Sequence, residues 1–187
     1  MAAGPFLAVW ATMSVAMMLP SAVPLLRLDF ATERSRLRTG VLASGYVSVW
    51  IAAGVALLAL DRLAAGRLLM EHGRVTTATL LAAAALYQLL PPKRACLARC
   101  RAPLARILFG WRDGLAGAAR MGVENGLWCA GCCVGLMAAL LAVGMMSVAW
   151  MAAFGAVILV EKTSRYGLGA ARLVAVALAA GAVVWAL

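Results

Sequence analysis

Long uncharged apolar stretches alternate with short arginine-rich segments along this chain of 187 residues. A helix needs about 20 apolar residues to cross about 30 Å of hydrocarbon, and one stretch, residues 125–160, is long enough for two crossings. The turn between these two crossings is expected at residues 144–147, where Gly144 allows a positive φ. The pattern predicts six transmembrane helices, at about residues 4–26, 40–60, 75–91, 124–143, 146–161 and 167–187.

The basic residues of the predicted loops fall mainly on one side of the membrane. Loops one, three and five carry four, seven and three Lys or Arg, 14 in total, when Arg172 near the start of the sixth helix is counted with loop five. Loops two and four carry three and none. Positively charged loops stay in the cytoplasm, so we expect a multi-pass protein of the cell inner membrane with both termini outside the cytoplasm. This placement accounts for the net charge of +10 and argues against nucleic acid as a partner, since no single basic face forms.

The composition excludes an ordinary soluble domain, because 65% of the residues are hydrophobic and only 13% are charged. The expected fold class is all-α: a polytopic membrane helix bundle that forms one transmembrane domain over residues 1–187. Within the long third loop, residues 104–120 mix apolar side chains with Arg106, Arg112 and Arg120. This mixture predicts a short amphipathic helix that lies on the membrane surface.

Sulfur-containing residues gather at the cytoplasmic end of the predicted bundle. Cys96 and Cys100 follow the third helix, and three more cysteines begin the fourth, so the topology places all five at similar depth. Helical spacing puts Cys129, Cys133 and Met137 on one stripe, and the first helix carries a stripe of methionines that could face it. The candidate metal ligands are Cys96, Cys100, Cys129, Cys132, Cys133, Met17, Met18 and Met137.

Small residues on the fourth predicted helix indicate how it packs. Gly122 and Gly126 share the stripe of the thiols, and Gly131 and Gly135 form a second pair on the opposite face. Pairs of small residues at this spacing let neighbouring helices approach closely in membranes. We therefore expect other helices to pack against both faces.

The sulfur ligands favour a soft metal and the function of metal handling or transport. Thiols and thioethers select Cu(I), so copper is the expected cofactor, and zinc at a thiolate site is the second choice. The single histidine, His72, lies in the second loop on the opposite side, which disfavours a His-rich site. The sequence shows no phosphate-binding glycine loop and no paired intramembrane carboxylates, so a binding protein is favoured over an enzyme.

Two other functions fit the same residues. Cys and Met also pack as ordinary apolar side chains, so the chain is alternatively a metal-free accessory subunit, with lipid and other membrane subunits or a homo-oligomer as partners. A thiol-redox protein using the Cys132–Cys133 or Cys96–Cys100 pair ranks last, because a disulfide between adjacent cysteines is strained. Glu161-Lys162 is either a boundary charge pair or places a carboxylate at the mouth of the sulfur pocket.

Several short segments carry a family resemblance. They are Met17-Met18-Leu19-Pro20-Ser21, Tyr87-Gln88, the run from Pro91 to Pro103 with its two cysteines, Gly126 to Cys133 with Leu136-Met137, and Glu161-Lys162. Together they resemble the DUF2182 family of predicted metal-binding integral membrane proteins, and the resemblance covers nearly the whole chain. It implies a metal site in the membrane. Asn125 stands where that family commonly has a His, which leaves a site built from sulfur and either favours copper further or implies a weakened site.

Overall fold

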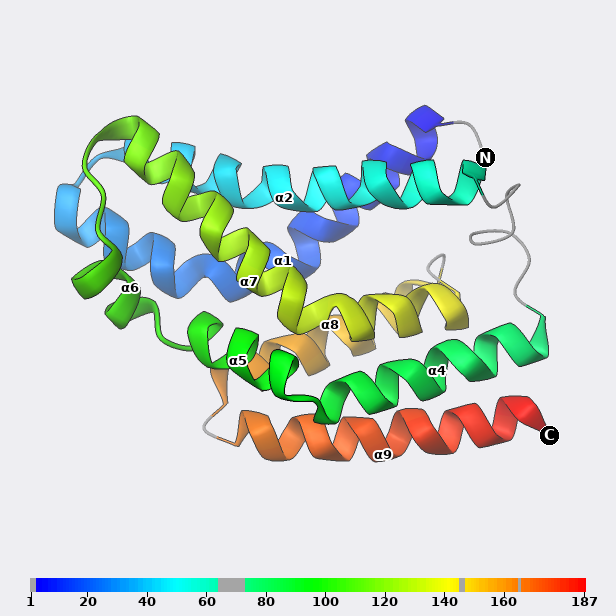
Figure 1. The fold of residues 1–187 in the computed structure, drawn as a ribbon. Coiled ribbons are helices and arrows are strands. Elements are labelled where there is room, and N and C mark those ends of the chain that lie inside the picture. The colour runs from blue at the N-terminus through cyan, green and yellow to red at the C-terminus, as the bar shows by residue number, and fades with distance from the viewer. Residues whose placement is uncertain (1–2, 64–72, 145–146, 165) are drawn as a thin grey trace. The chain divides into compact units, whose positions relative to one another are not determined.

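A computed structural model describes residues 3–63, 73–144, 147–164 and 166–187, and the regular structure within these residues is α-helical (Figure 1). Two sequence predictions fall on residues outside these ranges. The turn predicted at 144–147 lies partly outside, because it includes residues 145–146, and His72 of the predicted second loop lies wholly outside. The helices are α1 (Ala3–Glu33), α2 (Arg36–Leu63), α4 (Arg74–Leu89), α5 (Pro91–Cys100), α6 (Pro103–Gly110), α7 (Gly114–Val143), α8 (Val148–Thr163) and α9 (Gly167–Ala186).

Four of the described helices, α1, α2, α7 and α9, are long and apolar enough to cross a membrane. A fifth candidate consists of α4 and α5 together, which are bent by 65° at the break between them. The break falls at Leu90, because the residue before Pro91 is pushed out of the helical region. Helix α8 has 16 residues, or about 24 Å at 1.5 Å per residue, and falls short of a full crossing. The all-α class is confirmed, whereas six crossings stay a prediction.

Two helix boundaries differ from the expected ones by seven residues or more. Helix α1 continues past the predicted end at residue 26 to Glu33, and α7 begins at Gly114, ten residues before the predicted start at 124. The predicted interfacial segment 104–120 is therefore divided between α6 and the first turns of α7. Gly114 has a φ of +72°, a conformation that suits glycine and separates the two helices.

The chain forms two compact units, which are described separately. Unit 1 consists of residues 1–56 and 96–130, and unit 2 of residues 57–95 and 131–187. In unit 1, α1 packs against α6, and a core of Leu25, Leu42, Ala118 and Met121 joins α1, α2 and α7.

A buried arginine ties together the helix ends of unit 1. Arg38 Nε lies 3.0 Å from Asp29 Oδ1, and the two side chains are only 3% and 0% exposed. The same guanidinium donates hydrogen bonds of 3.0 Å to the carbonyl oxygens of Arg112 and Gly114, and it stacks on the Trp111 ring. Arg38 therefore links the α1–α2 corner to the connection between α6 and α7.

Glycines bring α2 and α7 into close contact within unit 1. A Cβ atom added at Gly122 would overlap the carbonyl oxygen of Leu42, and one added at Gly126 would contact Val49. Gly45 on α2 approaches the carbonyl of Ala119 in the same way. The predicted close approach at Gly122 and Gly126 is confirmed.

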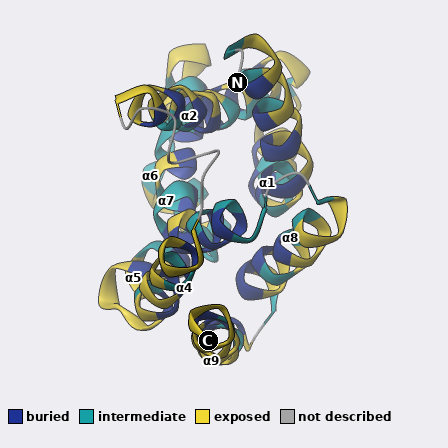
Figure 2. Ribbon diagram, turned by 90° about the vertical axis from the view of Figure 1, so that its right-hand side faces the viewer, coloured by how far each residue is buried: buried dark blue, intermediate teal, exposed yellow. Residues whose placement is uncertain are grey.

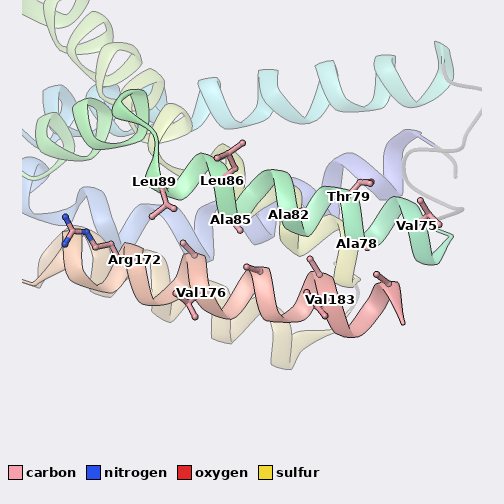
Figure 3. A pocket seen from close by; sticks show the side chains of 14 residues that line it. Val75, Ala78, Thr79, Ala82, Ala85, Leu86, Leu89, Arg172, Val176 and Val183 are labelled. Carbon is pink, nitrogen blue, oxygen red and sulfur yellow. The ribbon is translucent and has the colours of Figure 1, made fainter.

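In unit 2, α9 packs along α4 and also contacts α8. The face of α7 that carries Gly131 and Gly135 packs against α4 in this unit. Gly135 lies against the Tyr87 ring, and the Tyr87 hydroxyl donates a hydrogen bond of 2.5 Å to the Gly131 carbonyl oxygen. An open apolar groove of about 950 Å³ runs between α4 and α9, with Arg172 at one end (Figure 3). Large apolar side chains such as Leu173 and Val176 are exposed on α9, whose surface is largely yellow in Figure 2.

Candidate functional site

Three cysteine thiols are buried on α7, the helix whose two faces carry the glycine contacts. Cys129, Cys132 and Cys133 are 2%, 1% and 1% exposed, and each is present as a thiol. Burial keeps water away from the sulfur atoms. Because α7 is one continuous helix, the spacing of four places Cys133 one turn beyond Cys129.

In unit 1, the Tyr46 hydroxyl links α1 to α7. It donates a hydrogen bond of 3.0 Å to the Met18 carbonyl oxygen and lies 2.9 Å from Cys129 Sγ. Since a phenol has one proton and that proton goes to the carbonyl, the Cys129 thiol donates to the phenol oxygen. Met17 and Met18 are themselves 9% and 1% exposed. The backbone at Met18 and the Cys129 thiol therefore share Tyr46 as a neighbour.

In unit 2, two adjacent thiols lie near one another. Cys132 Sγ and Cys133 Sγ are 3.5 Å apart, and Met137, one helical turn beyond Cys133, is 7% exposed. This distance places the two soft sulfur donors of Cys132 and Cys133 side by side in the interior of unit 2.

The remaining two candidate ligands are more accessible. Cys96 and Cys100 lie on α5 and are half-buried. Within the described part of the chain, no three His, Cys, Asp or Glu side chains are close enough together to hold a metal ion. The complete set of eight ligands therefore stays a prediction. Three of its members, Cys129, Cys132 and Cys133, are buried and thus shielded from water.

Three buried polar side chains of unit 2 form a cluster that the sequence analysis did not predict. Glu161 Oε2 lies 2.6 Å from Lys93 Nζ, and Glu161 Oε1 accepts a hydrogen bond of 3.0 Å from Gln88 Nε2. All three residues are at most 2% exposed. Gln88 Oε1 is buried with no hydrogen-bond partner among the described residues. The sequence pattern marked Gln88 and Glu161-Lys162 separately, and nothing in it paired Glu161 with Lys93.

These features define a class: an all-α protein with helices apolar enough to cross a membrane and with soft sulfur donors in its interior. Over residues 7–185 the chain matches the PpoB2 family, described as a copper chaperone, and it belongs to this family. No curated protein and no solved structure matches the chain. Copper handling is thus shown at the level of the family, and membership of DUF2182 stays a prediction.

Proposed function

We propose that this protein is a membrane-embedded copper chaperone that holds Cu(I) on the thiols of α7 and passes the ion on. The observation that carries the proposal is the burial of Cys129, Cys132 and Cys133 on one helix in a chain of a copper chaperone family. Copper is the cargo in this proposal and not a resident cofactor.

The donor set fits Cu(I) by its chemistry. Thiolate and thioether sulfurs are soft ligands that prefer Cu(I) to the harder divalent ions. Thioethers add no charge to a buried site, so Met18 within unit 1, and separately Met137 within unit 2, can add a soft donor without a further desolvation cost. In unit 2, the adjacent thiols of Cys132 and Cys133 supply two more sulfur donors.

The half-buried cysteines on α5 suit transfer. Thiol ligands exchange a metal fastest when a partner can reach them, and Cys96 and Cys100 are more exposed than the thiols of α7. We assign them to exchange with a partner, and the α7 thiols to retention. In the proposed topology both groups face the cytoplasmic side of a six-helix protein, an arrangement supported by the charge of the loops and the four long apolar helices.

The test is the copper content of protein purified in mild detergent under reducing conditions and loaded with Cu(I). Wild type is expected to retain at least one copper per chain, and the Cys129→Ser, Cys133→Ser double variant to lose it. Ala130→Ser on the same helix is the matched control, because it adds a hydroxyl without removing a thiol. Unchanged copper in the double variant, or no copper in wild type, would contradict the proposal.

A further inference from the structure

A second cavity, unrelated to the sulfur residues of α7, lies in unit 1 where α6 meets the first half of α7. Its volume is about 650 Å³. Two arginines, Arg99 and Arg106, line it together with Glu124, and its apolar wall includes Phe109, Leu127 and Trp128. The cavity therefore combines cationic and apolar surface.

The charge around this cavity is unbalanced. Glu124 is the acidic partner of three guanidinium groups, with Arg120 Nε at 3.1 Å, Arg112 Nη2 at 3.5 Å and Arg106 Nη1 at 3.9 Å. One carboxylate cannot neutralise three cations. Arg99 stacks on Trp128 with its Cζ 3.9 Å from the ring centroid and makes no ion pair within the described residues. An excess of positive charge thus surrounds the cavity.

Arg106 carries a desolvation cost that its neighbours offset only in part. Its side chain is 12% exposed, and burial lowers the pKa of its guanidinium. The neighbouring groups Cys100 and Glu124 raise this pKa, whereas Arg99 lowers it further. The contact with Glu124 is the longest of the three. An anion in the cavity would compensate this cost, because charge-assisted hydrogen bonds to arginine are strong.

Helix α6 supplies an apolar surface beside these cations. The helix buries none of its residues, and Leu104, Leu108 and Phe109 are 56%, 64% and 88% exposed. Leu104 and Leu108 are four residues apart and share one face. Exposed apolar residues next to basic ones are typical of a helix at the headgroup level of a bilayer.

We propose that this cavity binds the phosphate headgroup of an anionic phospholipid, with the acyl chains lying against the exposed apolar face of α6. Arg99 and Arg106 hold the phosphate, since the planar guanidinium fork matches two phosphate oxygens. Trp128 fixes the plane of Arg99 by stacking. The proposal does not depend on copper.

The test measures lipid retention by the full chain in mild detergent, using native mass spectrometry with added phosphatidylglycerol or phosphatidylcholine. We expect wild type to prefer phosphatidylglycerol and the Arg99→Gln, Arg106→Gln variant to bind it about 10-fold more weakly. The matched control is Arg34→Gln, Arg36→Gln, which removes the same charge from exposed arginines on the same predicted side of the membrane. The control is expected to bind like wild type.

A further variant guards against misfolding as an explanation. Glu124→Gln removes the carboxylate that competes with phosphate, so phosphatidylglycerol should bind several-fold more tightly, a gain that an unfolded protein cannot produce. Equal losses in the cavity and control pairs, equal retention of the two lipids, weaker binding by Glu124→Gln, or equal affinity for free glycerophosphate would each overturn the proposal.

Discussion

The ammonium group of Lys93 lies 2.6 Å from the carboxylate of Glu161, and both side chains are almost completely buried in unit 2. The pair joins α5 to α8 directly beyond the 65° break between α4 and α5. Gln88 at the end of α4 donates to the same carboxylate, so three helices of the unit converge on one negative charge. Such a charge is tolerated in the interior because its partners compensate the lost hydration.

Removing one member of this pair should destabilise unit 2. For Glu161→Gln we expect the free energy of unfolding to fall by about 3–5 kcal/mol, because an uncompensated ammonium remains buried. The double variant Lys93→Met, Glu161→Leu should recover most of the loss, since neither charge of the pair is then left without its partner. Thermal unfolding in detergent, followed by circular dichroism, measures both. A single variant as stable as wild type would show that the pair is not buried.

The close contact between α2 and α7 predicts a sharp difference between two glycines. Gly122→Ala should lower the free energy of unfolding by about 1–3 kcal/mol, because the new methyl group overlaps the Leu42 carbonyl. Gly40→Ala is the control on α2, where an added Cβ meets nothing within 4 Å. That change should be neutral or stabilising by up to about 1 kcal/mol, the helix preference of Ala over Gly. Equal effects in thermal unfolding would disprove the close approach.

The phenol of Tyr46 should matter for stability more than for copper. In Tyr46→Phe, the Met18 carbonyl and the Cys129 thiol lose a shared partner, and we expect a loss of about 0.5–1.5 kcal/mol in unfolding free energy. The copper content should stay at the wild-type level, because the sulfur donors are intact. The control is Tyr166→Phe at an exposed position. Loss of copper from Tyr46→Phe would instead assign the phenol to the metal site.

Arg38 should not be replaceable by lysine. Arg38→Lys keeps the charge but cannot reach Asp29 and the carbonyls of Arg112 and Gly114 together, because an ammonium lacks the planar fork of a guanidinium. We expect a lower unfolding temperature and faster proteolysis between α6 and α7. Limited proteolysis with mass analysis of the fragments locates the opening, and exposed Arg36→Lys serves as the control. Identical cleavage of both variants would argue against this anchoring role.

Periodicity was enough to predict the packing of α7. The spacing of Gly122, Gly126, Gly131 and Gly135 specified two close contacts, because on a helix the positions of side chains follow directly from sequence separation. The start of α7 at Gly114 was missed, since an apolar run marks the residues suited to hydrocarbon and not the end of the helix.

Contacts between distant segments could not be foreseen in the same way. Lys93 and Glu161 are 68 residues apart, and no local pattern states which buried charge will meet which. Burial of the cysteines was indicated by their apolar surroundings on the fourth predicted helix. Their grouping with Met17 and Met18 depends on tertiary distances, which a stripe on each helix alone does not determine.

The two glycine-lined faces of α7 have a consequence for the biogenesis of the protein. Their partners, Leu42 on α2 and Tyr87 on α4, both precede α7 in the chain and are therefore synthesised first. Membrane helices insert individually and associate afterwards, so the arrival of α7 is the step at which either contact can first form. A nascent chain that stops before residue 114 lacks the helix that packs against both α2 and α4, and it presents these uncovered surfaces to the cell's proteases.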